Sequence, residues 1–267
     1  MDDIGGSLQT LLVDWDPSIS LVTLTLNRPQ ALNAISRSLA AELLAACAML
    51  SARDDVRAVV VTGTGERAFC AGADLKERRT LSAAEKALHT TEIEAAAEAL
   101  AALPMPTIAA IRGFALAGGA ELAIACDLRI AADDATFGFP EVKIGIFPGA
   151  GGALRLPRIV GNGAARDLLF TGRQIDATEA FRIGLIDRTV PAERVMDSVR
   201  ELAMAIAANA PLAVRAVKRA LDDSYGQPLP RAREIVNALR AALDDTADYA
   251  EGLAAFAERR PPKFSGR

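Results

Sequence analysis

The sequence predicts an α/β fold, a superhelix of repeated strand–turn–helix units followed by a helical C-terminal segment. Short apolar, β-favouring runs alternate with glycine turns and helical patterns along the first half of the chain, which is the order of elements in α/β domains. The intervals between units are irregular, so the pattern does not indicate a regular solenoid. A length of 267 residues suits one large α/β domain with an appended segment.

Strands are expected where short apolar runs end at turn residues. Residues 19–26 alternate apolar and β-favouring side chains and stop at Asn27-Arg28-Pro29, and residues 58–63 form a buried run that ends at a glycine. Two further strands are predicted at 107–111 and 128–131. Apolar residues at helical spacing predict helices between these strands, over 36–49, about 83–102 and 119–125.

From Gly151 onward the pattern changes to helices almost without strands. They are expected over 193–208, 211–223, 229–244 and 248–259. Helices that follow a completed α/β core need an apolar surface to cover, and a second subunit offers one as readily as the chain's own core. We place the boundary between an α/β core, residues 1–195, and a helical C-terminal domain, residues 196–267, near the start of the first of these helices.

Composition limits the partners and the compartment. With 30 basic and 34 acidic residues the formal net charge is −4, so the chain lacks the global basic field that nucleic-acid binding needs. Three scattered cysteines, Cys47, Cys70 and Cys126, and a single histidine build neither a disulfide framework nor a zinc cluster, and a reducing cytoplasm is expected. Residues 1–6 lack the features of a signal peptide and no apolar stretch reaches the length of a membrane span, so we expect a soluble protein with no membrane partner.

Glu121 and Glu141 are the most informative charged residues because both stand in apolar surroundings. Glu121 lies within the run 118–123 and Glu141 within the run 138–142. A buried carboxylate loses hydration, so it shifts its pKa or finds a partner, and such groups gather at functional sites. Each also has an ordinary interpretation, Glu121 as an acid that complements a helix dipole and Glu141 as a surface turn carboxylate.

Two loops of small residues can bring backbone amides close to a ligand. The loop 68–76 follows a buried strand, and residues 117–119 open a helix whose free N-terminal amides favour a developing negative charge. One amide from each loop can together hold a single carbonyl oxygen. Glu121 falls on the first turn of that helix, which brings its carboxylate near the amides, and the glycine-rich run 145–152 after Glu141 is a further loop of close approach.

Other catalytic motifs are absent from the sequence. It contains no G-x-S-x-G elbow, no G-x-G-x-x-G after a strand and no Walker lysine motif, so serine-hydrolase, dinucleotide and nucleotide-triphosphate functions lack support. Cys70 has no second catalytic group beside it, and His89, the only histidine, lies among threonines in the long helix. Both are interpreted as structural or solvated side chains.

These motifs, in this order, resemble the enoyl-CoA hydratase/isomerase (crotonase) superfamily over nearly the full chain. The resemblance rests on Asn27-Arg28-Pro29 with Leu32-Asn33-Ala34, on residues 68–76, 106–113 and 118–122, on Cys126-Asp127, on Phe139-Pro140-Glu141, on residues 149–152, and on Glu251-Gly252 with Phe256. Residues 71–78 and 258–262 look most like the methylglutaconyl-CoA hydratase branch. The implied fold is a crotonase-type superhelix that holds the acyl-CoA site, followed by a C-terminal trimerisation domain.

The resemblance implies a role for each candidate catalytic residue. The amides of Ala73 and Gly118 form an oxyanion hole for the thioester carbonyl. Glu121 orients and activates a water molecule, and Glu141 exchanges a proton as general acid and base. Ala117 departs from the glycine that many relatives have at this position, which affects the shape of the loop more than the Gly118 amide.

The resemblance also implies a binding site for CoA. Its residues are Arg28, Ala71, Asp74, Leu75 and Lys76, with Phe256 and Arg259 of a neighbouring subunit closing over the nucleotide end. Cations near phosphates are physically sensible, because charge-assisted hydrogen bonds hold highly charged groups. No metal or redox cofactor is expected, since the CoA thioester is the substrate.

The expected activity is hydration of a 2-enoyl-CoA to a 3-hydroxyacyl-CoA in lipid metabolism, by a homotrimer or a hexamer made of two trimers. The alternatives within the family are an enoyl-CoA isomerase, which works with one glutamate, and a methylglutaconyl-CoA hydratase. An RNA-binding protein and an inactive structural paralogue are alternatives of another class. The acidic balance argues against RNA, and the presence of both glutamates argues against inactivity.

Overall fold

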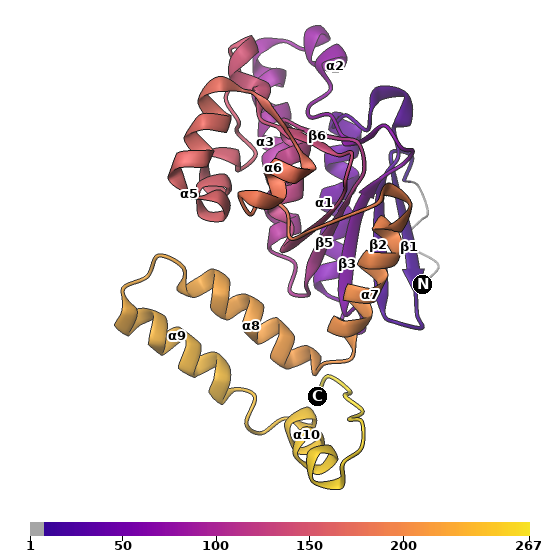
Figure 1. Cartoon of the computed structure of the whole chain (residues 1–267), viewed down its shortest axis with the longest axis vertical. Helices are drawn as coiled ribbons and strands as arrows, with labels where there is room; N and C mark the ends of the chain where they lie inside the picture. Colours follow the sequence, from indigo (N-terminus) through magenta and orange to yellow (C-terminus); the bar gives the residue numbers. More distant parts are fainter. Residues whose placement is uncertain (1–7) are drawn as a thin grey trace.

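The core contains two sheets of short strands, between which the chain passes repeatedly (Figure 1). In spatial order the first sheet has β1 (Leu11–Asp16), β2 (Leu21–Leu26), β3 (Ala58–Gly63), β5 (Thr107–Ile111), β7 (Leu128–Ala132) and β10 (Arg188–Val190). The second has β4 (Ala68–Cys70), β6 (Phe114–Leu116), β8 (Thr136–Gly138) and β9 (Gln174–Asp176). The computed structural model describes residues 8–267, so the N-terminal run examined for a targeting signal lies outside the described residues.

The order of the strands produces the superhelix. β3, β5 and β7 belong to the first sheet, and the strand that follows each of them, β4, β6 or β8, belongs to the second. Neighbouring strands are parallel in both sheets, except that β1–β2 and β8–β9 are antiparallel. Every turn of the chain thus adds one strand to each sheet, and the predicted fold class is confirmed.

Helices cover these sheets and extend beyond them. They are α1 (Arg37–Ser51), α2 (Leu75–Thr80), α3 (Ala83–Ala101), α4 (Gly118–Ala125), α5 (Gly152–Thr171), α6 (Ala177–Arg182), α7 (Val195–Ala207), α8 (Pro211–Ser224), α9 (Leu229–Ala241) and α10 (Ala247–Glu258), with 3-10 turns η1 (Pro29–Ala31), η2 (Pro140–Ile144) and η3 (Ala192–Arg194). Side-chain caps fix several starts. Ser82 and Glu85 form a capping box at α3, for example, which satisfies two free amides of the first turn.

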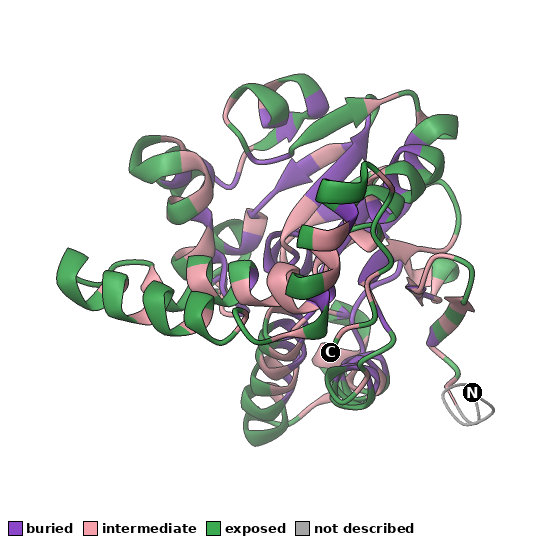
Figure 2. Cartoon of the chain, turned by 90° about the horizontal axis from the view of Figure 1, so that it is seen from below, coloured by how far each residue is buried: buried purple, intermediate pink, exposed green. Residues whose placement is uncertain are grey.

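The hydrophobic core lies between the first sheet and its helices. β3 and β5 are apolar runs because parallel strands are covered on both faces, and all five residues of β5 are buried. Figure 2 shows the buried residues gathered in the sheet region, whereas the C-terminal helices are mostly exposed or half-buried. Residues 8–267 contain no helix long and apolar enough to cross a bilayer.

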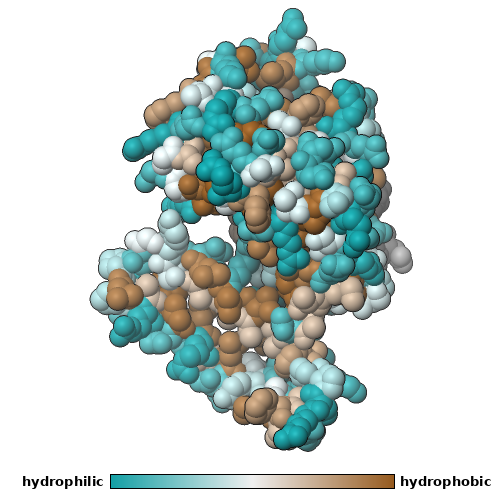
Figure 3. All heavy atoms as spheres, in the orientation of Figure 1, coloured by the Kyte–Doolittle hydropathy of each residue, from teal (hydrophilic) through white to brown (hydrophobic). Residues whose placement is uncertain are grey.

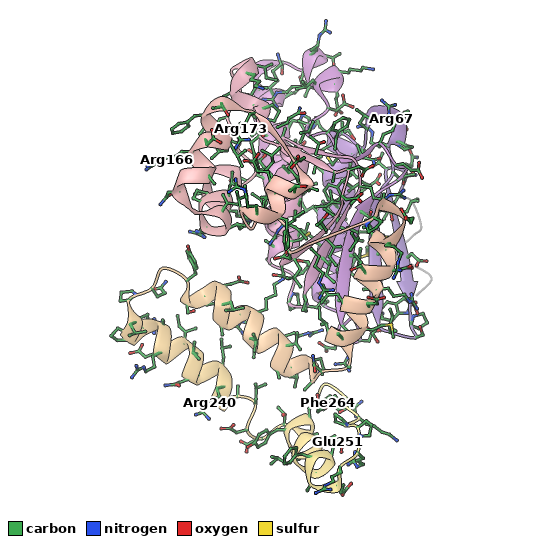
Figure 4. The ribbon with its side chains drawn as sticks, in the orientation of Figure 1. Arg67, Arg166, Arg173, Arg240, Glu251 and Phe264 are labelled. Carbon is green, nitrogen blue, oxygen red and sulfur yellow. The ribbon has the colours of Figure 1, made fainter. Side chains whose placement is uncertain are left out.

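The C-terminal helices leave the core after α7. That helix, which begins at the boundary predicted between the two domains, packs on β3, β5 and β7, whereas the α8–α9 hairpin and α10 project away from the sheets (Figure 1). Nζ of Lys218, on α8, donates to Asp127 Oδ2 at 2.7 Å and ties the hairpin to the core. The tail after α10 folds back toward α10, and Phe264 lies in this tail (Figure 4). The carboxylate of Asp248, on α10, accepts hydrogen bonds from the backbone amides of Ser265 and Gly266.

The expected long elements are present close to their predicted bounds. Four strands and seven helices match, from β2 to α10. β1, α2, α5, α6 and the three-residue strands were not predicted, and β4 occupies the first residues of the loop expected over 68–76. α5 was not predicted because Pro157 and the non-helical Gly161 interrupt its helical pattern.

Candidate active site

A cavity of about 150 Å³ opens between α2, α3, α4 and η2. It collects the four predicted catalytic and oxyanion residues, which lie far apart in the sequence. Its lining consists of Ala71, Ala73, Leu75, Arg78, Thr90, Ile93, Ala117, Gly118, Glu121, Pro140, Glu141, Ile144, Ile146, Phe147, Gly149 and Ala150. Apart from Arg78, Thr90 and the two glutamates, these residues are apolar or contribute backbone, as in most small-molecule sites.

The two proposed oxyanion amides meet because β4 and β6 are parallel neighbours. The loops after parallel strands emerge at the same edge of a sheet, which brings Ala73 beside Gly118. A Cβ atom built on Gly118 would lie 3.6 Å from the amide nitrogen of Ala73. Neither amide donates to a protein acceptor among residues 8–267, so both are available to one ligand oxygen.

Ala117 holds the second of these loops in an unusual backbone conformation. Its φ is +50° and its ψ is −129°, a region that residues with a Cβ atom rarely adopt. The Ala117 amide donates to Gly138 O at 2.9 Å, and its carbonyl accepts from the Glu121 amide at 3.0 Å. These bonds keep the loop in the shape that places the Gly118 backbone at the cavity.

Glu121 is buried on the first turn of α4, with 3% of its surface exposed. Its Oε1 accepts a hydrogen bond from the Gly152 amide at 2.8 Å. Burial raises the pKa of Glu121 to about 7, and the nearby charge of Glu141 adds to this rise while the Gly152 amide opposes it. A carboxyl group with this pKa can both accept and release a proton near neutral pH.

Glu141 lies in η2 and is also buried, with 7% of its surface exposed. Both of its carboxylate oxygens are inaccessible and accept no protein hydrogen bond, and burial raises its pKa. A surface turn carboxylate would be solvated, so the ordinary interpretation of this residue does not describe it. Buried acids without partners are uncommon outside functional sites.

The residues expected to bind CoA fall into two groups. Ala71 and Leu75 line the cavity. Beside them, Arg28 Nη2 donates to Asp74 Oδ2 at 2.8 Å, and Asp74 caps α2 by accepting from the amides of Lys76 and Glu77. Arg28 and Asp74 thus fix the loop that carries Ala73, while the Lys76 side chain is exposed.

Phe256 and Arg259 are not brought to the cavity within one chain. Both belong to the end of α10, in the projecting part of the molecule (Figure 1), and neither lines the cavity. Phe256 is 86% exposed, which is unusual for so large an apolar side chain. A role for either residue at the site requires a second chain.

Cys70 and His89 are both fully buried. Burial raises the pKa of the Cys70 thiol to about 12, which makes it a poor nucleophile. His89 is not solvated: its Nε2 lies 3.2 Å from the carbonyl oxygen of Ile35, the group that also accepts from the Asp74 amide at 2.9 Å. The histidine therefore supports the loop that carries Ala73.

Several cavity residues were not singled out from the sequence, notably Arg78, Thr90 and Phe147. Arg78 follows Leu75 by three positions, which puts both on one face of α2, and this spacing is the signal that could have found it. Thr90 and Phe147 carry no comparable signal. Residues 8–267 contain no group of three or more His, Cys, Asp or Glu side chains placed to hold a metal ion.

Comparison with known proteins identifies the family. Residues 17–267 match the family model described as enoyl-CoA hydratase/isomerase. A Bacillus subtilis protein named putative enoyl-CoA hydratase/isomerase is 44% identical over 92% of this chain and 95% of its own length. A human mitochondrial protein named enoyl-CoA hydratase domain-containing protein 2 is 41% identical over 98% of this chain and 91% of its own.

A solved structure agrees with these relatives. The enoyl-CoA hydratase from Bacillus anthracis superposes with a TM-score of 0.95 at 40% identity and covers 97% of this chain and 100% of its own. The fold and these relatives define an enzyme of the crotonase superfamily. The chain belongs to its enoyl-CoA hydratase/isomerase family.

Proposed function

We propose that the protein is an enoyl-CoA hydratase, which adds water across the 2,3 double bond of a 2-enoyl-CoA to give a 3-hydroxyacyl-CoA. The observation that carries this proposal is the meeting of two buried carboxylates and two unpaired amides in one cavity. The amides suit a thioester oxygen on which negative charge develops, and the acids suit a water molecule and a proton.

The chemistry follows from these positions. Hydrogen bonds from the Ala73 and Gly118 amides polarise the thioester and make C3 electrophilic. Glu121 takes a proton from a water molecule while the oxygen of that water bonds to C3. The π electrons of the double bond move toward the thioester oxygen, and an enolate forms. Glu141 then delivers a proton to C2 and the carbonyl re-forms. One oxyanion donor contributes about 3 kcal/mol to such a reaction.

An enoyl-CoA isomerase is the main alternative within the family. It needs one acid to move a proton along the chain, so the second buried glutamate favours hydration. Incubation with 2-enoyl-CoA thioesters should remove the absorbance of the conjugated thioester, whereas an isomerase should generate that absorbance from a 3-enoyl-CoA. Failure to hydrate any member of a panel that includes methylglutaconyl-CoA would contradict the hydratase assignment.

RNA binding is the alternative of another class. The net charge of −4 opposes it, because phosphate contacts require a basic surface. Filter binding at several salt concentrations separates the two functions, since absence of binding at low salt excludes an RNA-binding role.

The three cysteines are free and buried, in keeping with the cytoplasm as the predicted compartment.

Phe256 and Arg259 are expected to reach the CoA of a neighbouring subunit, so the proposed assembly is a homotrimer, or a hexamer made of two such trimers. Large apolar side chains are exposed along α8, α9 and α10, namely Val217, Leu221, Tyr225, Leu229, Val236, Tyr249, Leu253 and Phe256. Figure 3 shows apolar atoms gathered over these helices. A surface of this kind favours association. A single monomeric species in analytical ultracentrifugation would exclude the trimer.

A further inference from the structure

Arg155 connects three segments of the chain beside the active-site cavity. It lies on the first turn of α5 and is half-buried. Its Nη2 forms an ion pair with Glu98 Oε1, on α3, at 2.7 Å. Its Nη1 donates to the carbonyl oxygen of Ala150 at 3.3 Å. Ala150 lines the cavity and Arg155 does not, so the guanidinium contacts the wall of the cavity and not a ligand within it.

The part of the wall that Arg155 contacts is the loop of residues 149–152, with the sequence Gly-Ala-Gly-Gly. Gly151 has a φ of +109°, which favours glycine. A Cβ atom built on Gly151 would overlap Nη1 of Arg155, so the guanidinium lies directly against the backbone of this residue. Only Ala150 carries a side chain, a single methyl group. The shape of so flexible a loop therefore depends on contacts from outside it.

The shape of this loop sets the position of Glu121. The amide of Gly152, the last residue of the loop, donates to Glu121 Oε1 at 2.8 Å. A shift of the loop would break this bond or move the carboxylate with it. Proton transfer depends steeply on such alignment, since a displacement of about 1 Å can lower a rate by about 100-fold. Contacts that fix the loop therefore bear on the reaction.

The positive charge of Arg155 acts on Glu121 as well. Burial raises the pKa of Glu121 and the charge of Glu141 adds to this rise, whereas the Arg155 guanidinium opposes it. The other charged groups near this carboxyl are Glu98, which is paired with Arg155, and Arg78, which lines the cavity. Removal of the Arg155 charge should therefore favour the protonated form of Glu121.

We propose that Arg155 is a positioning residue for hydration, which holds the loop 149–152 so that the Gly152 amide keeps Glu121 in place for proton transfer from water. This inference rests on the proposed hydratase function and adds a residue that touches no reacting atom. The ion pair with Glu98 fixes the guanidinium, and the bond to Ala150 fixes the loop against it. The fork of donors of an arginine reaches both contacts at once, whereas a lysine ammonium is a single point charge.

Steady-state kinetics at several pH values separate positioning from substrate binding. Arg155→Met should lower kcat for the best substrate of the enoyl-CoA panel by about 100-fold and change KM by less than about threefold, because no substrate contact is lost. The acid limb of its kcat–pH profile should move to higher pH, since Glu121 loses a cation that favours its charged form. Arg155→Lys keeps the charge, so its acid limb should stay at the wild-type position and only part of kcat should be lost.

Arg166→Met is the matched control. Arg166 is exposed on the same helix (Figure 4) and lines no part of the cavity, so its kcat and pH profile should equal those of the wild type. An unmoved acid limb in Arg155→Met, a loss confined to KM, or an equal loss in Arg166→Met would overturn the proposal. If Arg155→Met does not fold, Arg155→Lys decides, and a wild-type kcat in that variant would contradict the positioning role.

A measurement without substrate separates this inference from the hydratase function. Infrared difference spectra of a protein with and without the Glu121→Gln change follow the ionisation of the Glu121 carboxyl group. Arg155→Met should raise the pH at which this group ionises, and an unchanged ionisation would count against the contact. If no thioester is hydrated but the ionisation still shifts, the hydratase function fails and the role of Arg155 in holding Glu121 stands.

Discussion

The backbone amide of Gly152 donates a 2.8 Å hydrogen bond to Oε1 of Glu121. This bond joins the start of α5 to the first turn of α4 and holds one carboxylate oxygen in place. A Cβ atom built on Gly152 would lie 2.9 Å from the same oxygen, so the close approach requires glycine. Glu141 lines the same cavity, and in the proposed mechanism these two carboxyl groups are the reacting acids.

Replacing either acid by its amide should remove most of the activity. Glu121→Gln and Glu141→Gln keep the size of the side chain but can no longer exchange a proton, so turnover of a 2-enoyl-CoA should fall by about 100- to 10,000-fold. Steady-state kinetics measure the loss. Glu94→Gln, at an exposed position of α3, is the control and should match the wild type. Near-normal hydration by either of the first two variants is incompatible with the proposed roles.

Long periodic segments were predictable because their residue patterns decide their structure. The apolar run of β3 and the alanine-rich α3 have nearly the bounds that the sequence predicts. The strands of the second sheet were not predicted, because three residues are too few to show an alternation of apolar and polar side chains. Their pairing depends on contacts between distant segments, such as that between β4 and β6.

The candidate site was predictable in its residues but not in its environment. The small-residue loops predicted one backbone amide from each, and the family resemblance implied those of Ala73 and Gly118. The structure brings both residues to one cavity with the two glutamates. The burial of Glu141 and the lining role of Arg78 depend on how η2 and α2 pack, which no local pattern encodes. The supporting role of His89 could not be predicted, because its contact with the carbonyl oxygen of Ile35 joins positions 54 residues apart.

The raised pKa of Glu121 should make stability depend on pH. Its pKa is about 7 in the fold against 4.5 for the free group, so the folded state binds more protons between these values and loses stability as pH rises through them. Glu121→Gln removes this dependence. Relative to the variant, the wild type should lose about 3 kcal/mol of unfolding free energy between pH 4 and pH 8.

Urea unfolding of both proteins at the two pH values, at one protein concentration, measures this difference. Comparison of wild type with variant cancels the titration of all other groups that do not interact with Glu121. A difference that stays constant with pH would mean that Glu121 titrates as an ordinary exposed glutamate.

Ala117→Gly should stabilise the fold. The φ of +50° and ψ of −129° at Ala117 cost an alanine about 1 to 3 kcal/mol and cost glycine almost nothing. Glycine also has more conformational freedom in the unfolded chain, which offsets up to about 1 kcal/mol of this stabilisation. We therefore expect the free energy of unfolding to rise by about 1 kcal/mol. Thermal unfolding measures it. Ala115→Gly, in the preceding strand β6, is the control and should destabilise. A lower Tm for Ala117→Gly would show that the loop is not strained.

Lys218 should hold the C-terminal helices to the core. Its Nζ donates to Asp127 Oδ2 at 2.7 Å and to Met105 O at 3.2 Å, and Asp127 also accepts from Thr107. Lys218→Met leaves that carboxylate without its cation, at a cost of about 3 kcal/mol. Hydrogen exchange should then accelerate in α8 more than in the strands of the first sheet, because α8 loses its fixed contact with the core.

Arg219→Met provides the comparison on the same helix. Arg219 is exposed and reaches Asp223 only at 3.7 Å, and exposed pairs of this kind contribute less than about 1 kcal/mol. Because the two variants remove the same charge one residue apart, a difference between them isolates the buried contact with Asp127. If both variants accelerate exchange in α8 equally, the attachment of the hairpin depends on the net charge of α8 and not on the ion pair.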